Sequence, residues 1–354
     1  MNRLEERYRR VLRLLPRQYR QAWADDMVAA FLESMQSTDP ETTAYLRDYG
    51  RPSVAEVASV GSLAVRLRLG GVDSPPRLFA WGQAVRLAVL LSLLANAVPA
   101  AAGIAVTVWL SGRVGWLPTP STEWTPATPS VIWQGVGQLT AYGWLGAYLA
   151  LVLGHRRVAQ GIAVLAVVPP LVMTAVLQFS GVAPLTVSPW ATSLLDVLVV
   201  AAMAAFHRDA PPVRRRPWLV ALPIGLLLVP VPLLVAQTSG AALRFLDGPG
   251  ISCVLVTAAM IGYLAGRVPP GRAPGTPRWP LALTLLAAAA LGLRLVTLVD
   301  QRGQVPGATP TAAIAVQIVA VLAVGVPLAG LARRALRRLP AGSGARKAPV
   351  DEVA

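Results

Sequence analysis

Long apolar segments recur along the chain from residue 87 onward. The first, residues 87–110, runs 24 residues without an ionisable side chain, and an α-helix needs about 20 apolar residues to cross the hydrocarbon core of a bilayer. Seven further segments repeat this pattern. The predicted transmembrane helices cover residues 87–110, 132–153, 158–180, 190–206, 218–238, 250–266, 280–299 and 312–332. The pattern predicts an all-α fold, a polytopic membrane bundle of about eight transmembrane helices.

Residues 1–71 show a different pattern, charged and amphipathic, which predicts a small cytoplasmic module of three helices. In its second helix, Tyr19, Trp23, Met27 and Phe31 are each four residues apart. Such spacing places them on one helix face, which suits either the core of the module or a face that docks a protein partner. The apolar face predicted for its third helix comprises Val54, Val57, Gly61, Ala64 and Val65.

The remaining boundaries follow from composition. Residues 72–86 are expected to form a linker and an interfacial lead-in to the transmembrane domain, which we place at residues 87–332. Residues 333–354 form a basic tail whose Ala, Gly and Pro content is typical of disorder.

Composition and charge support a membrane protein. The chain has 354 residues, of which 55% are hydrophobic and 14% charged, whereas soluble domains carry about 25% charged residues. The net charge of +15 could suggest a nucleic-acid partner. However, 15 of the basic residues lie in the tail and in the loops after alternate predicted helices, and the opposite loops hold only Arg113, Arg244 and Arg302.

This asymmetry is the positive-inside pattern. It predicts a multi-pass protein of the cell membrane with both termini in the cytoplasm. The partners we expect are the lipid bilayer and a cytoplasmic protein that binds residues 1–71. No direct contact with nucleic acid is expected.

Two ionisable residues lie well inside predicted transmembrane helices, Asp196 and Arg294. Each is about six residues from the outer end of its helix, a depth of roughly 9 Å at the rise of an α-helix. Matched depth favours an intramembrane polar pair. Charges inside a membrane are usually paired or functional, so the alternatives are structural pairing, snorkelling of the arginine, and a substrate- or proton-handling role.

Four amide residues could line a polar cavity in the outer half of the bundle. They are Asn96, Gln138, Gln178 and Gln317. The alternative interpretation is hydrogen bonding between neighbouring helices, a common use of amide side chains in membrane bundles.

No pattern of catalytic or ligand-binding residues stands out. Cys253 is the only cysteine, which excludes an internal disulfide and a CxxC redox pair. The Walker A, HExxH and GxSxG motifs and the Gly-rich dinucleotide loop do not occur. We therefore expect no catalytic residues, no cofactor and no metal site, and a protein that is not an enzyme.

One stretch of the N-terminal region carries a family resemblance. Residues 8–35, YRRVLRLLPRQYRQAWADDMVAAFLESM, contain a Leu-Leu-Pro-Arg motif, then Tyr-Arg, an acidic Asp-Asp pair and an apolar run. This stretch resembles HAAS-type membrane-attached signalling domains and the related prefix domain of some export permeases. Residues 53–70 are similar to the helix that follows in actinobacterial members. The resemblance implies a cytoplasmic protein-interaction module attached to a membrane sensor, without catalysis.

The leading hypothesis is therefore a non-enzymatic integral membrane protein whose cytoplasmic helical module serves protein-partner signalling or regulation. The alternative is a transporter or permease subunit that uses a polar cavity in the outer half of the bundle. A membrane enzyme acting on lipid-linked substrates is a third, weaker hypothesis, because the sequence lacks clustered carboxylates or histidines.

Overall fold

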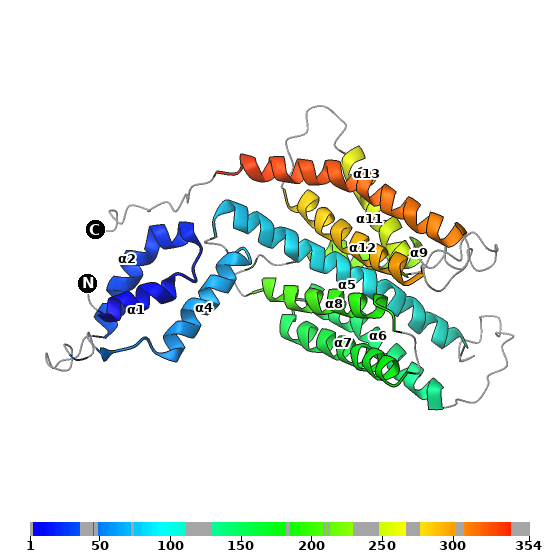
Figure 1. Cartoon of the computed structure of the whole chain (residues 1–354), viewed down its shortest axis with the longest axis horizontal. Coiled ribbons are helices and arrows are strands. Elements are labelled where there is room, and N and C mark those ends of the chain that lie inside the picture. The colour runs from blue at the N-terminus through cyan, green and yellow to red at the C-terminus, as the bar shows by residue number, and fades with distance from the viewer. Residues whose placement is uncertain are drawn as a thin grey trace.

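A computed structural model describes residues 3–35, 45, 49–71, 74–110, 129–181, 185–207, 210, 213–228, 248–266, 277–301 and 308–340. Every regular element in these ranges is a helix (Figure 1). The elements are α1 (Arg3–Leu12), α2 (Arg17–Ser34), α4 (Val54–Arg68), α5 (Pro76–Leu110), α6 (Pro129–Val152), α7 (Arg156–Phe179), α8 (Ser188–Ala202), the 3₁₀ turn η1 (Met203–Ala205), α9 (Arg215–Leu228), α11 (Gly248–Ala265), α12 (Arg278–Gln301) and α13 (Ala308–Arg338).

Helices α1, α2 and α4 form a small module with its own apolar core at one end of the molecule (Figure 1). Leu4 and Tyr8 of α1 are buried there against α2, and the Tyr8 ring stacks on Phe31 with 4.0 Å between ring centroids. Ser53 begins α4 as its N-cap by accepting a hydrogen bond from the Glu56 backbone N–H at 3.1 Å, which satisfies one of the unpaired donors of the first turn. The Tyr8 hydroxyl donates to the Glu56 carboxylate at 3.2 Å and joins α1 to α4.

The face of α4 that packs into this core differs from the predicted one. Of the predicted residues, Ala64 is buried, whereas Val54 is 87% exposed and Val65 53% exposed. The buried face consists instead of Val60, Ala64 and Leu67. Helix α4 carries apolar residues on two faces, and periodicity alone does not say which of them meets α1 and α2.

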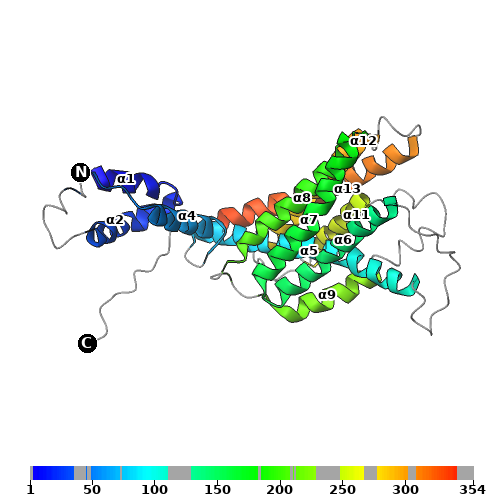
Figure 2. The same cartoon turned by 90° about the horizontal axis from the view of Figure 1, so that it is seen from below.

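The remaining helices form one bundle around α5 (Figures 1 and 2). On one side, α5 packs with α6, α7 and η1 around a core that includes Leu93, Tyr148 and Met203. A second core joins α11, α12 and α13. Near the module, Ala84 and Leu87 of α5 pack with residues of α12 and α13, so α5 lies between the two groups of helices.

The structure supports a helical membrane bundle. Within the described ranges, six helices are long and apolar enough to cross a bilayer: α5, α7, α8 continued through η1, α11, α12 and α13. Helices α6 and α9 coincide with two further predicted segments. However, only Thr140–Val152 of α6 qualifies as a shorter apolar helix, and the described part of α9 ends at Leu228. The count of eight transmembrane helices therefore stays a prediction.

Two predicted boundaries also differ from the structure. The lead-in is helical from Pro76 and continuous with α5. Residues 333–338, predicted to belong to a disordered tail, form the last turns of α13, because Arg, Ala and Leu are strong helix formers. The rest of the tail, from residue 341, lies outside the described residues.

Two glycines join the module to the bundle. Gly70 follows α4 with φ of +77°, and its neighbour Gly71 donates its N–H back to the Arg66 carbonyl at 2.9 Å, so the chain turns sharply at the helix end. A Cβ built on Gly82 of α5 would lie 2.1 Å from the Leu69 carbonyl oxygen and 2.7 Å from the Gly70 Cα. The end of α4 and the start of α5 are thus in backbone contact that only glycine permits.

Candidate functional site

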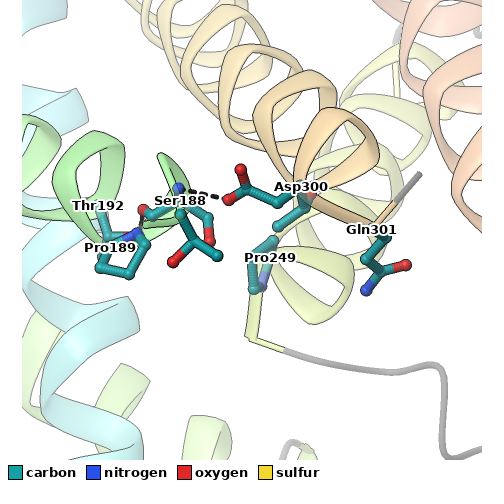
Figure 3. A pocket seen from close by; sticks show the side chains of 8 residues that line it. Ser188, Pro189, Thr192, Pro249, Asp300 and Gln301 are labelled. Atoms are coloured by element: carbon teal, nitrogen blue, oxygen red, sulfur yellow. Dashed lines mark hydrogen bonds between the residues drawn. The ribbon is translucent and has the colours of Figure 1, made fainter. Parts of the chain in front are cut away.

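A pocket of about 410 Å³ lies at the opposite end of the bundle from the module, and we call it the distal pocket. Figure 3 shows it from close by. It lies where the N-terminal ends of α8 and α11 meet the C-terminal end of α12. Its lining comprises Thr186, Ser188, Pro189, Thr192, Pro249, Thr297, Asp300 and Gln301. Its size falls within the range of small-molecule sites.

Asp300 joins α12 to α8 at this pocket. One carboxylate oxygen accepts the Val187 backbone N–H at 3.0 Å and the other accepts the Ser188 N–H at 2.7 Å; the Ser188 hydroxyl is a further hydrogen-bond partner. The first N–H groups of a helix lack partners within the helix, and a negative charge is favourable there. Asp300 therefore caps α8, although it lies more than a hundred residues away from α8 in the sequence.

Gln178 also forms hydrogen bonds with residues at the N-terminal end of α8. Its side-chain N–H₂ donates to the Thr186 carbonyl at 3.1 Å and to the Thr186 hydroxyl at 3.3 Å, and its Oε1 accepts from the Trp190 indole at 2.6 Å. These bonds join α7 to the segment before α8. Gln178 therefore lies behind the pocket wall, and its contacts match the alternative interpretation of hydrogen bonding between helices.

The two ionisable residues predicted to pair lie deeper in the bundle. Asp196 of α8 has a side-chain hydrogen bond with Asn96 of α5, so the structure brings together two of the predicted polar residues. Arg294 of α12 is only 1% exposed. Helices α8 and α12 are neighbours, but a pairing of Asp196 with Arg294 stays a prediction.

The other predicted lining residues do not gather at the distal pocket. Gln317 belongs to α13, where its Oε1 atom is buried and has no hydrogen-bond partner in the described part of the chain. The side chain of Gln138 lies outside the described residues. Asn96, Gln178 and Gln317 do not line the pocket.

Sequence reasoning missed the residues that do line it. Asp300 and Gln301 directly follow the transmembrane helix predicted at residues 280–299, whereas the predicted polar residues lie inside such helices. An acidic residue directly after an apolar segment was the available signal. The sequence did not show that it meets the start of α8.

The four aromatic and apolar residues predicted to share one face of α2 take different positions. Phe31 is 7% exposed and belongs to the module core, against which Tyr19 and Met27 also pack. Trp23 is 42% exposed. The predicted docking face is therefore largely core, and the exposed apolar side chains of the module include Leu14, Trp23 and three valines of α4, Val54, Val57 and Val65.

Among the described residues, no group of three or more His, Cys, Asp or Glu side chains is placed to hold a metal ion. Comparisons with protein-family models, with curated proteins and with solved structures give no match. The resemblance of the N-terminal region to HAAS-type domains accordingly stays a prediction.

Proposed function

We propose that the chain is a non-enzymatic, multi-pass protein of the cell membrane whose N-terminal helical module docks a cytoplasmic protein and regulates it. The observation that supports this most directly is the exposed apolar face of α4, which comprises Val54, Val57 and Val65. These valines belong to a helix outside the membrane-spanning candidates.

Burial of the exposed valines would favour binding of a partner to the module. Burying a valine side chain contributes roughly 1.5–3 kcal/mol, and an apolar patch on a water-facing surface marks an interaction site. Val54, Val57 and Val65 recur at helical spacing, which suits the apolar face of a partner helix. The Arg66 and Arg68 side chains at the end of α4 favour a partner with acidic residues beside that face.

The attachment of the module to α5 would allow partner binding to affect the bundle. Helix α4 ends in backbone contact with Gly82 of α5. A partner that shifts α4 therefore acts on the first membrane-spanning helix through this backbone contact. The signal that we propose is this coupling: binding of a partner to α4 changes the position of α5, and a change in the position of α5 changes the affinity of α4 for the partner.

The docking proposal is tested with the full chain in native membranes. A photo-crosslinking amino acid at Ala58, an exposed position of α4, should give one dominant protein adduct. Val54→Asp and Val65→Asp should abolish that adduct, because a buried unpaired carboxylate is costly. Ser59→Asp, a matched charge at another exposed position of α4, should leave it unchanged. Equal adduct formation by all variants would contradict the proposal.

We further propose eight transmembrane helices with both termini cytoplasmic. The support is the alternation of basic loops together with helices at all eight predicted positions. Reporter fusions after residues 110 and 154 should report opposite sides of the membrane. The same side for both would contradict an intervening transmembrane α6.

A second candidate function is transport, favoured by the contact between Asp196 and Asn96 inside the bundle. Carboxylates within membrane helices serve in proton relays. In proteoliposomes that contain a pH-sensitive dye, this hypothesis predicts faster decay of an imposed pH gradient with the wild type and slow decay with Asp196→Asn. Thr284→Val is the control, since the Thr284 hydroxyl donates to the Pro280 carbonyl of its own helix. Decay equal to that of empty liposomes in the wild type would refute it.

A further inference from the structure

Basic side chains gather where α1 ends and α2 begins. Residues 13–20 contain Arg13, Arg17 and Arg20 and no acidic residue. Arg13 and Arg17 are exposed, and Leu14 beside them is 45% exposed. We call Arg13, Leu14, Arg17 and Arg20 the arginine turn. It combines positive charge with one exposed apolar side chain.

The ion pairs of the module involve other arginines. They are Arg9 with Glu5, Arg9 with Asp25 and Arg10 with Glu6, each at 2.9 Å. Within the described ranges, none of the three arginines of the arginine turn forms an ion pair. Their charges are therefore left for a partner outside the chain.

The arginine turn lies on the side of the module that faces the bundle (Figure 1). Arg68, in the last turn of α4, donates a hydrogen bond to the Leu14 carbonyl at 3.0 Å. Two residues later, Gly70 is in backbone contact with Gly82 of α5. The arginine turn is thus held beside the point where α4 meets the first membrane-spanning helix.

This meeting point lies at the level expected for lipid headgroups. Gly82 is five residues before residue 87, where the first apolar segment begins, a distance of about 7.5 Å along an α-helix. The headgroup layer on each side of the hydrocarbon core is roughly 5–8 Å thick. The neighbouring Trp81 is exposed, and tryptophan is enriched at the interface between membrane and water. The arginine turn therefore lies next to the bilayer surface.

We propose that the arginine turn docks the module on anionic lipid headgroups of the bilayer surface beside α5. A guanidinium group presents five N–H donors in a planar fork that matches phosphate oxygens. An anionic leaflet attracts basic residues that lie close to it. Leu14 enters the interface between the arginines, as apolar residues of interfacial helices do.

An acidic protein segment would complement the same charges, but the position of the arginine turn favours the bilayer. The bond from Arg68 and the contact at Gly82 hold the turn close to the membrane-spanning start of α5. The proposal rests on the cytoplasmic location proposed above, because anionic lipids give the cytoplasmic leaflet its negative surface potential. It concerns a different surface from the exposed valines of α4.

The test uses the full-length protein in nanodiscs. A fluorescent label is attached at Gln21→Cys, an exposed position of α2 beside the turn, in a protein that also carries Cys253→Ala. Part of the lipid has a nitroxide quencher on its headgroup. Quenching should be stronger in mixtures of phosphatidylglycerol and phosphatidylcholine than in phosphatidylcholine alone. The difference should vanish in about 1 M salt, where the Debye length is about 3 Å. Equal quenching in both lipids would overturn the proposal.

A pair of matched variants assigns the contact to the arginine turn. Each basic residue near an anionic surface contributes about fivefold to its attraction, so Arg13→Gln with Arg17→Gln should weaken docking about 25-fold. Arg3→Gln with Arg51→Gln is the control, because both residues are exposed and precede or begin helices at the ends away from the turn. This control should keep the quenching of the wild type. Equal quenching in the two double variants would overturn the proposal.

The outcome is separable from that of partner docking. Both leaflets of a nanodisc have the same composition, so the result does not depend on which side of the cell membrane the module faces. The purified protein is free of cytoplasmic partners, so lipid-dependent quenching reports the bilayer alone. Loss of the crosslink at α4 with intact lipid-dependent quenching would refute partner docking only, and the reverse result would refute lipid docking only.

Discussion

The contact between Gly82 and the end of α4 allows a sharp prediction about how the module is attached. In Gly82→Ala, the new methyl carbon would lie 2.1 Å from the Leu69 carbonyl oxygen and 2.7 Å from the Gly70 Cα. Both neighbours are backbone atoms, so no side-chain rotation relieves the clash. Restoring an ordinary separation of about 3.5 Å requires α4 and α5 to move apart by more than about 1 Å.

The expected cost follows from this displacement. Overpacking of a close contact costs about 1–3 kcal/mol, whereas replacing a helical glycine by alanine gains about 0.5–1 kcal/mol in helix propensity. The clash therefore exceeds the gain, and Gly82→Ala should destabilise the junction. Gly61→Ala is the matched control, because a Cβ at Gly61 of α4 has no other atom within 4 Å and should stabilise the helix.

The assay is hydrogen exchange of the full-length protein in nanodiscs. Amides at the end of α4 and the start of α5 should exchange faster in Gly82→Ala, and amides of α12 should be unchanged. Gly61→Ala should exchange as slowly as the wild type or more slowly. Exchange at the junction that is the same in both variants would refute a rigid attachment of the module.

Three further predictions concern individual side chains. Phe31→Ala should unfold the module, with a loss of about 3–5 kcal/mol, whereas Trp23→Ala should cost under about 1 kcal/mol; circular dichroism melting compares them, and equal losses would contradict the core. Burial, and secondarily the charge of Glu56, raises the pKa of Tyr8 to about 12. Because this folded-state pKa lies above the unfolded value near 10, the module should lose stability between pH 10 and 12, and Tyr8→Phe should remove that loss in alkaline titrations; an unchanged profile would contradict the burial of Tyr8. Asp300→Ala should cost about 1 kcal/mol as a lost helix cap and speed exchange in the first turn of α8; unchanged exchange there would refute the cap.

Much of the helical architecture was predictable from the sequence. The segment predicted at residues 158–180 is observed as Arg156–Phe179, and that predicted at 280–299 as Arg278–Gln301. Such segments are recognisable because the bilayer fixes the length of an apolar helix. Their neighbours in space are not encoded locally, and the position of α5 between two groups of helices was not foreseen.

The faces of the module helices were harder to predict. Phe31 and Trp23 occupy equivalent positions in the helical pattern of α2, yet Phe31 stacks on Tyr8 and Trp23 is partly exposed. The difference arises because α1 covers only part of the α2 face. Helix α4 has two apolar faces, and the face that contains Val60, not the one that contains Val54, packs into the core.

The candidate site was the least predictable feature, because it depends on long-range contacts. Asp300 caps a helix that begins 112 residues earlier, and no local pattern specifies that pairing. Asp196 and Asn96 were recognisable as unusual polar residues in apolar segments, but their contact with each other was not. Sequence reasoning therefore found polar residues but not their partners.

The most direct test of a cytoplasmic module on a membrane-spanning bundle is thiol labelling in intact cells. The only native cysteine, Cys253, is buried and is replaced by alanine. A new cysteine is then placed at an exposed position of α4 by Ser59→Cys. A membrane-impermeant maleimide should label this residue only after the cells are permeabilised. Labelling in intact cells would contradict a cytoplasmic module.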